Sequence, residues 1–198
     1  MSYWPPDFNA TGTHVSVQML HMDHKSDLED AAADGELDEL WYTSVPEPEG
    51  IGAEISRRLA EREAGRMLPF AIIERASGKA VGMTTYMNID AANKRVEIGS
   101  TWYRKSVQRG PLNTECKWLL LKNAFEGLHC NAVEFRTHFI NSQSRRAIER
   151  LGAKQDGLLR NHMIMPNGTL RDTAVYSIIA GEWPMIDAHL RYQMEKPR

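Results

Sequence analysis

The sequence has few cysteines and no long apolar run. Its two cysteines, Cys116 and Cys130, form no Cys-x-x-Cys pair among the 198 residues, which excludes a disulfide framework and a cysteine-based metal site. No apolar stretch approaches the roughly 18 residues that a membrane-spanning helix needs. The chain begins with prolines and Asp7 where a signal peptide would have a basic and then an apolar stretch. These absences predict a cytoplasmic globular protein with no membrane partner.

Strong net charge is also absent. The formal net charge is −2 and 42% of the residues are apolar, which is too apolar for a disordered chain. The length suits one compact domain, and two full domains would be cramped. The isoelectric point is near 6.4, whereas proteins that bind nucleic acid usually have a basic isoelectric point. We therefore do not expect nucleic acid as a partner.

The charges that are present are unevenly distributed. The segment Asp23–Glu54 has eleven acidic residues and one basic residue, and the segment Lys94–Lys122 has seven basic and two acidic residues. An acidic segment can attract a cationic substrate and a basic one a polyanion. Both patterns are also typical of solvated helix faces, which is the commoner explanation of such charge runs, and the sequence leaves the two interpretations open.

The hydrophobic pattern predicts alternating strands and helices. Strands are expected over His14–Leu20, Leu68–Glu74, Ala80–Asn88, Arg95–Trp102, Ala132–Thr137, Lys154–Met165 and Leu170–Ala180. Helices are expected within Asp27–Leu40 and over Ile51–Ala64, Asn113–Leu128, Ser142–Leu151 and Trp183–Met194, with a loop over Trp41–Gly50. Asn167-Gly168 between two strand patterns is a strong hairpin signal.

This order of elements predicts a single mixed α/β domain of the α+β kind. We expect a mostly antiparallel twisted sheet with helices on both faces. Residues 1–12 are interpreted as an N-terminal arm, 13–182 as the domain, and 183–198 as a C-terminal helix and tail.

The most informative segment is the predicted strand, loop and helix of Arg95–Glu126. Its loop, Arg104–Thr114, is basic and contains glycine, and it opens a helix. A helix N-terminus offers unpaired N–H groups and about half a positive charge, so this arrangement is typical of a phosphate site. We expect Asn113 or Thr114 to cap the helix and Glu115 to lie in its first turn. The loop is neither a P-loop nor a Rossmann fingerprint.

Several short motifs follow one another in order. They are Glu97-Ile98-Gly99, Gln108-Arg109, Asn113-Thr114-Glu115, Asn141-Ser142-Gln143-Ser144 and Ile148–Ala153. The series, which extends over about residues 13–182, resembles the GNAT acyl-CoA-dependent N-acetyltransferases. Within that family it is similar to the branch that includes the ribosomal-protein N-terminal acetyltransferases. The resemblance implies a GNAT-type domain that uses acetyl-CoA as co-substrate and no metal. Because members of this branch often pair, it also implies a homodimer.

The resemblance implies a set of coenzyme contacts around the loop. They are Trp102, Tyr103, Arg104, Gln108, Arg109, Gly110, Pro111, Leu112, Asn113, Thr114, Asn141 and Ser144. Pro111 stands where the family has glycine, and proline removes one N–H group from the phosphate cradle. Gly110, whose φ is unconstrained, is a candidate to restore that access. Ile148 stands where many members have a tyrosine general acid.

Acetyl transfer to an amine needs a neutral nucleophile, a polarised thioester carbonyl and a proton for the departing thiolate. The resemblance implies that Gly99 marks a strand distortion beside the pantetheine arm. It also implies that a backbone N–H near Thr101 or Trp102 stabilises the oxyanion. Glu97 shares the face of Gly99 and is the candidate general base, acting through water. An orienting role or an ordinary surface glutamate stays open.

Asn141 and Ser144 are three residues apart and lie on one face of a predicted helix. Ser144 is the candidate general acid near the coenzyme sulfur, and Asn141 is the candidate to hold the pantetheine or the start of the helix. Both residues fit simple helix capping equally well. Tyr176 is an alternative acid, although tyrosines in strands more often pack in a core.

Other residues have weaker signals. Trp41 and Tyr42, together with Glu97, are candidates to line the acceptor site, although core or lid packing suits the two aromatic residues as well. His21 and His24 have no third ligand at motif spacing, so we expect no metal site. Cys116 is expected to pack in the core.

The sequence therefore predicts an N-acetyltransferase that moves acetyl from acetyl-CoA directly onto a primary amine. A protein or peptide N-terminus is one candidate acceptor, and a small-molecule amine is another. The departures at Pro111 and Ile148 keep a second class open, a non-catalytic acyl-CoA-binding sensor or interaction protein.

Overall fold

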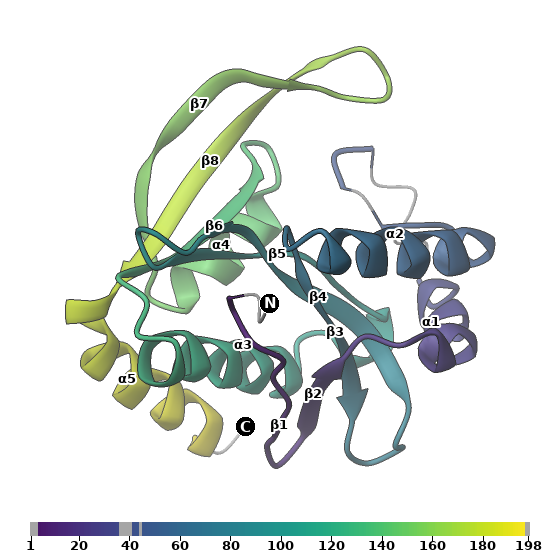
Figure 1. Ribbon diagram of the computed structural model, residues 1–198, viewed down its shortest axis with the longest axis horizontal. Coiled ribbons are helices and arrows are strands. Elements are labelled where there is room, and N and C mark those ends of the chain that lie inside the picture. Colours follow the sequence, from purple (N-terminus) through teal and green to yellow (C-terminus); the bar gives the residue numbers. More distant parts are fainter. Residues whose placement is uncertain (1–3, 36–40, 44, 197–198) are drawn as a thin grey trace.

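The computed structural model describes residues 4–35, 41–43 and 45–196. In this part of the chain one eight-stranded sheet has the order β1-β2-β3-β4-β5-β6-β8-β7 (Figure 1). Its strands are β1 (Ala10–Thr11), β2 (Val15–Met19), β3 (Leu68–Glu74), β4 (Ala80–Asp90), β5 (Arg95–Tyr103), β6 (Ala132–His138), β7 (Lys154–Ile164) and β8 (Leu170–Ile179). Every neighbouring pair is antiparallel except β5 and β6. The predicted mostly antiparallel mixed fold is confirmed.

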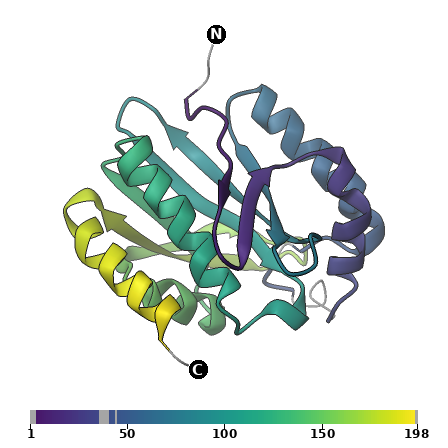
Figure 2. The same ribbon diagram turned by 90° about the horizontal axis from the view of Figure 1, so that it is seen from below.

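Helices cover both faces of the sheet, as predicted. They are α1 (Lys25–Ala32), α2 (Ile51–Glu63), α3 (Leu112–Lys122), α4 (Ser142–Arg150) and α5 (Trp183–Glu195). Apolar residues of α3, α4 and α5 join the main core, and those of α1 and α2 form a smaller cluster on the other face. Figure 2 shows α3 and α5 side by side on their face. Because side chains alternate along a strand, Val96 and Ile98 of β5 enter the main core and Glu97 points to the α1–α2 face.

Three elements differ from the prediction. The helix expected to reach Leu128 leaves the α-helical pattern after Lys122 and continues as a π-helical turn over Asn123–Gly127, where the Leu128 N–H reaches back to the carbonyl of Asn123. The N-terminal arm contains β1, which pairs with β2. Of the helical segment predicted up to Leu40, α1 accounts for the first part, and residues 36–40 lie outside the described residues.

Glu115 ties the start of the chain to α3. Its carboxylate accepts hydrogen bonds from the backbone N–H groups of Thr13, His14 and Val15 at 2.7, 2.6 and 3.0 Å. A Cβ at Gly12 would lie 2.4 Å from the carboxyl carbon of Glu115, so the turn before β2 requires glycine. Glu115 lies in the first helical turn as predicted, and it also fixes the position of β2.

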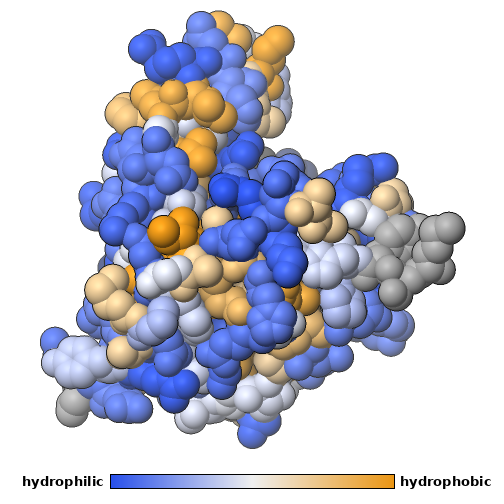
Figure 3. Space-filling view, turned by 60° about the vertical axis from the view of Figure 1, so that its left-hand side comes forward, coloured by the Kyte–Doolittle hydropathy of each residue, from blue (hydrophilic) through white to orange (hydrophobic). Residues whose placement is uncertain are grey.

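The hairpin of β7 and β8 projects from the body of the molecule (Figure 1). Its turn contains Asn167 and Gly168, as predicted, and Gly168 has the left-handed φ of +80° that such a turn requires. Figure 3 shows apolar side chains on this hairpin, where Leu159, Met163, Ile164 and Leu170 are exposed. None of the helices in the described residues is long and apolar enough to cross a bilayer.

Candidate functional site

The sheet opens between its two parallel strands. β5 and β6 are paired only over Arg95–Glu97 and Ala132–Glu134. Beyond these residues β5 continues to Tyr103 and β6 to His138 without pairing to each other. Strand edges that separate in this way leave backbone N–H and C=O groups free for an extended ligand.

β5 is bulged beside this opening. Ser100 and Thr101 together stand opposite Thr84 of β4, because the register shifts at this point. Ser100 has a left-handed φ of +47°. A bulge turns backbone groups out of the hydrogen-bonding pattern of the sheet and aims them elsewhere. The strand distortion expected at Gly99 is therefore present, beginning one residue later.

Two buried cationic side chains hold the bulge, one from each face of the sheet. From α3, the Lys117 ammonium donates to the hydroxyls of Thr101 at 2.7 Å and Thr84 at 3.3 Å. From α2, the Arg58 guanidinium donates to the carbonyl of Ser100 at 3.1 Å. Burial lowers the pKa of Lys117 to about 8. Neither contact was predicted, because nothing in the sequence near Arg58 or Lys117 distinguishes them from surface residues.

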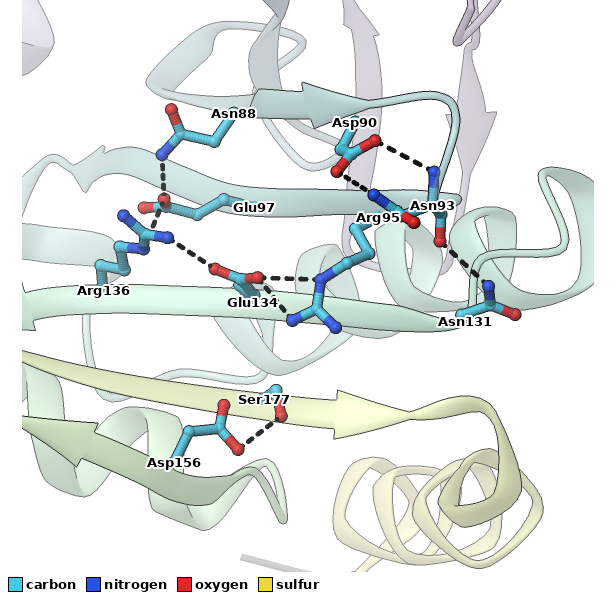
Figure 4. A network of polar contacts seen from close by, with 10 residues as sticks. All are labelled: Asn88, Asp90, Asn93, Arg95, Glu97, Asn131, Glu134, Arg136, Asp156 and Ser177. Atoms are coloured by element: carbon cyan, nitrogen blue, oxygen red, sulfur yellow. Dashed lines mark hydrogen bonds and ion pairs between the residues drawn. The ribbon is translucent and has the colours of Figure 1, made fainter.

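Glu97 lies where β5 and β6 separate, and its side chain is 6% exposed. Its Oε2 accepts a hydrogen bond from the Asn88 amide at 2.6 Å and lies 3.5 Å from Nε of Arg136 (Figure 4). A Cβ on Gly99 would lie 2.8 Å from Oε1 of Glu97, which confirms that the two residues share one face. Burial raises the pKa of Glu97 above its ordinary value. A carboxylate with a raised pKa suits general-base chemistry near neutral pH.

A chain of alternating charges continues from Glu97 across the strands. Arg136 also pairs with Glu134 at 2.9 Å, and Glu134 pairs with Arg95 at 2.5 Å (Figure 4). The arginine side chains lower the pKa of Glu134, against the opposing effect of its burial. This network fixes the orientation of Arg136 and therefore of the Glu97 carboxylate beside it.

The loop after β5 leads to the N-terminus of α3. The helix begins at Leu112 with Pro111 at the N-cap, so Asn113 and Thr114 lie in the first turn and do not cap it. Proline is tolerated at a helix start because its missing N–H would have no helical partner there. The N–H groups of Leu112, Asn113 and Thr114 likewise have no acceptor within the helix and are available to a ligand.

The tight turn in this loop is made by Arg109, which has a left-handed φ of +62°. Gly110 is not among the residues with positive φ, and Pro111 disfavours helical values for the backbone of the residue before it. That Gly110 restores access to the phosphate cradle stays a prediction. Gln108 closes the loop by donating from its side chain to the carbonyl of Tyr103 at 3.0 Å.

Not every basic side chain of the loop is available to a phosphate. Arg104 donates to the Asp34 carboxylate at 2.8 Å, and Ser106 donates to the same oxygen at 2.6 Å. The hydrogen bonds from Ser106 and Arg104 lower the pKa of Asp34 to about 2. Arg104, which the resemblance places against the coenzyme, is therefore held by Asp34, and Lys117 is buried beneath the bulge.

Unpartnered polar atoms around the start of α3 fit a coenzyme. Asn113 Oδ1 and Thr114 Oγ1 are buried and have no hydrogen-bond partner in the described structure. Since buried polar atoms are normally hydrogen-bonded, these atoms and the free N–H groups suit a ligand rich in phosphate, amide and hydroxyl groups, such as CoA. The rings of Trp102 and Tyr103 pack in the two apolar clusters, which leaves their main-chain groups for such a contact.

Asn141 and Ser144 lie at the N-terminus of α4. The Asn141 side chain accepts a hydrogen bond from the Ser144 N–H at 2.9 Å, so Asn141 caps the helix. The hydroxyl of half-buried Ser144 makes no hydrogen bond to any described residue. Ile148 is buried in the main core.

Tyr176 is placed differently from Ser144. Its side chain is fully buried, and its hydroxyl accepts a hydrogen bond from Arg145 at 2.9 Å and donates one to Glu149 at 2.9 Å. The proton of this hydroxyl is therefore already engaged. Burial raises the pKa of Tyr176. Of the two hydroxyls weighed as the acid, that of Ser144 has the unused proton.

Trp41 and Tyr42 pack around His138 at the end of β6, with ring centroids 5.5 and 6.4 Å from the imidazole. Trp41 is 48% exposed, whereas His138 is 6% exposed. The His138 Nδ1 accepts from the Ile140 N–H at 3.3 Å, and its Nε2 has no partner within the described residues. His138 was not predicted, although it alternates with Arg136 on β6 and so shares its face.

The acidic segment mostly stabilises its own surroundings. Asp27 accepts from the Ala80 N–H at 3.0 Å, and Glu54 binds Arg57 and Arg58 at 2.7 Å each. The acidic residues at positions 36, 38 and 39 lie outside the described residues. The residues that are described contain no group of three or more side chains able to hold a metal ion.

The strand opening, the bulge and the free helix N-terminus together form a site for an extended, phosphate-bearing ligand. Comparison with known proteins gives the family. Residues 19–154, more than half of the chain, match the model of the acetyltransferase (GNAT) domain. The chain belongs to the GNAT acetyltransferase family, as the motif series predicts.

Individual relatives agree with this assignment. The putative ribosomal N-acetyltransferase YdaF of Bacillus subtilis (strain 168) is 33% identical over 107 residues, which are 54% of this chain and 57% of that relative. A GCN5-related N-acetyltransferase from Brucella melitensis has a TM-score of 0.87 and 31% identity, over 96% of this chain and 86% of that chain. Mycobacterium smegmatis RimJ in complex with CoA-disulfide has a TM-score of 0.75 and 23% identity, over 90% and 88% of the two chains, and shows likeness of fold.

Proposed function

We propose that the protein moves the acetyl group of acetyl-CoA directly onto a primary amine, with a peptide or protein N-terminus as the acceptor. The observation that carries this proposal is the opening between β5 and β6, which has Glu97 at its closed end and the N-terminus of α3 beside its open end. The family assignment supports acetyl-CoA as the donor. The name of YdaF, a putative ribosomal N-acetyltransferase, supports an amine of a protein as the acceptor.

In the proposed mechanism the chain holds the donor with main-chain groups. The N–H groups of Leu112, Asn113 and Thr114 bind the diphosphate, and the free edges of β5 and β6 bind the pantetheine amides. Backbone N–H groups at the bulge, near Thr101 and Trp102, bind the oxygen that becomes negative when the amine attacks. Lys117 and Arg58 fix the bulge, so these donors need no reorganisation during the reaction.

Proton transfer involves two side chains. Glu97 accepts a proton from the ammonium form of the acceptor, through water, and leaves a neutral amine. Glu97 passes this first proton to solvent through the same water. The amine nitrogen then bonds to the thioester carbon, the carbon–sulfur bond breaks, and the Glu97 carboxylate takes up the extra proton of the amide product. The thiolate takes a proton from Ser144, which recovers it from solvent. Trp41 and Tyr42, which pack against His138, line the acceptor side.

Binding and turnover of CoA test the proposal together. CoA at about 100 times its Kd is expected to stabilise the fold by about 2.7 kcal/mol, measured as a thermal shift. Acetyl-CoA with a panel of peptide N-termini, polyamines and amino acids is expected to release free thiol steadily. Binding without thiol release for any acceptor would favour the acyl-CoA sensor, and transfer to polyamines alone would favour a small-molecule acetyltransferase.

Ser144→Ala tests the proposed general acid. The substitution removes the unpartnered hydroxyl and is expected to lower kcat at least about tenfold, while the backbone N–H that binds Asn141 and the fold remain. Ser142→Ala on the same helix, whose side chain is exposed, is the matched control and is expected to keep full activity. Unchanged turnover in Ser144→Ala would remove this serine from the mechanism.

The proposal also covers the organisation of the chain. It takes residues 13–182 as the transferase domain, with the arm 1–12 and the helix and tail 183–198 as flanking parts. It includes a cytoplasmic location and a homodimer. Light scattering during size-exclusion chromatography would test the dimer directly.

A further inference from the structure

Arg171 of β8 is a half-buried guanidinium that lacks a carboxylate partner. Its Nε donates to the hydroxyl of Thr173 at 3.0 Å. Within the described residues no carboxylate oxygen lies within ion-pair distance of Arg171. Removing a charge from water without a partner is unfavourable, and burial lowers the pKa of Arg171 accordingly.

The neighbouring arginines differ from Arg171. Arg95 pairs with Glu134, and Arg136 pairs with Glu134 and approaches Glu97. On the hairpin, Arg160 pairs with Asp172 at 2.7 Å. Within the described residues these guanidiniums are neutralised by the protein itself, whereas the terminal nitrogens of Arg171 have no such partner.

The sheet register places Arg171 near the proposed reaction centre. Thr173, to which Arg171 donates, is directly paired with His138 of β6. His138 and Arg136 lie on one face of β6, and Arg136 contacts Glu97. The charge of Arg171 also acts on both Glu97 and His138: burial raises the pKa of Glu97 and Arg171 opposes that rise, whereas burial and Arg171 together lower the pKa of His138. Arg171 therefore lies on the side of the sheet from which the amine would reach Glu97.

We infer that Arg171 binds a carboxylate of the acceptor and makes the enzyme selective for amines that carry an acidic group close to the amine. This inference rests on the proposed function. A guanidinium presents two parallel N–H groups that match the two oxygens of a carboxylate, so the pair gives orientation as well as affinity. With the amine at Glu97 and the carboxylate at Arg171, the acceptor is held at two points.

The carboxylate has two sources of the same chemistry, an acidic side chain next to a peptide N-terminus or the α-carboxylate of a free amino acid. Two matched pairs of acceptors separate them. One pair is the peptides Ser-Glu-Ala-Ala and Ser-Gln-Ala-Ala with free N-termini and amidated C-termini, and the other is serine and serinamide. The two members of each pair have nearly the same shape and size. They differ in the negative charge, which only one of them carries.

Arg171→Gln is expected to lower kcat/KM for the carboxylate-bearing member of the preferred pair by about 10- to 100-fold, mainly through KM. The uncharged member is expected to change little. Arg171→Lys keeps the positive charge but lacks the two parallel N–H groups of the guanidinium. Its kcat/KM for the carboxylate-bearing acceptor is expected to lie between those of the wild type and Arg171→Gln. Arg75→Gln, an exposed arginine in the turn between β3 and β4, is the matched control. The thermal shift with CoA is expected to be the same in all variants.

The outcomes separate this inference from the proposed function. A preference for the Glu peptide or for serine that disappears in Arg171→Gln supports the inference and identifies the source of the carboxylate. Equal rates within both pairs, or a loss in Arg171→Gln that is equal for charged and uncharged acceptors, overturns it while the transferase activity stands. If none of the four acceptors and no member of the wider panel causes thiol release, the proposed function itself is contradicted.

Discussion

Glu97→Gln is expected to lower kcat by about 10²- to 10⁴-fold, the range for loss of a general base. Glutamine has nearly the shape of glutamate, and its side-chain oxygen can still accept the hydrogen bond from Asn88 that Glu97 accepts at 2.6 Å. It cannot take up a proton at neutral pH. Steady-state kinetics with saturating acetyl-CoA would measure the loss, and Glu63→Gln, an exposed residue of α2, is the matched control.

The pH profile gives an independent test of the same residue. Burial raises the pKa of Glu97 in the folded protein, so the base is lost as the pH falls through this raised value. The wild type is therefore expected to show an acidic limb in kcat/KM above the ordinary pKa of glutamate, and Glu97→Gln is expected to lack it. Full turnover in the variant, or an unchanged acidic limb, would exclude Glu97 as the base.

The same shift has a consequence for stability, whose sign is opposite to that of an ion-paired carboxylate. Because the pKa is higher in the folded than in the unfolded state, the native protein binds this proton more tightly. Its contribution to stability is full below the unfolded pKa and is lost as the pH rises through the folded pKa. Near neutral pH, Glu97→Gln is therefore expected to unfold at a urea concentration equal to or above that of the wild type.

Local patterns predicted the elements that carry the site. Alternation along β5 placed Glu97 and Gly99 on one face, and the spacing after Gln108 indicated the free N-terminus of α3. These features depend on residues close together in the chain. Local errors occurred at the two ends of α3. Asn113 or Thr114 was expected to cap the helix, whereas Pro111 occupies the N-cap position, and the helix expected to reach Leu128 leaves the α-helical pattern after Lys122.

The contacts that the sequence could not show join distant segments. The Glu115 carboxylate binds backbone N–H groups about 100 residues earlier, and Arg58 of α2 reaches the bulge 42 residues later. In the sequence Lys117 and Arg171 look like ordinary surface cations, and only the packing of other elements around them makes them buried or half-buried. The pattern of charges in the sequence shows where cationic residues occur but not which of them are buried. Burial determines whether such a side chain holds the bulge, as Lys117 does, or lies on the surface.

Arg58→Met is expected to lower the free energy of unfolding by about 3 kcal/mol, the lower end of the range for breaking a buried ion pair. Arg58 is 1% exposed. Its three nitrogens donate to Glu54 at 2.7 Å, to the Thr85 hydroxyl at 2.8 Å and to the Ser100 carbonyl at 3.1 Å. Methionine fills much of the volume but leaves these acceptors without their donor. Glu54 keeps its second partner, Arg57, which is why the lower end of the range applies.

Arg57→Met is the matched control, because Arg57 binds the same Glu54 carboxylate but its side chain is 49% exposed. Its loss is expected to cost at most about 1 kcal/mol, as for surface ion pairs. Urea unfolding followed by tryptophan fluorescence would compare the two, with unchanged slopes showing that the difference is one of stability. Equal midpoints would mean that the buried contacts of Arg58 contribute nothing beyond a surface ion pair.

Activity measurements show whether Arg58 holds the geometry of the bulge or only stabilises the fold. Arg58 donates to the carbonyl of Ser100, so its removal frees the peptide group in the bulge whose neighbours are proposed to bind the oxyanion. At a temperature where both variants are fully folded, Arg58→Met is expected to lose kcat while Arg57→Met keeps it. If the two variants were equally active there, the bulge would hold its geometry without Arg58. The stabilisation of the oxyanion would then depend on the contacts of Lys117 and Thr101 from the opposite face alone.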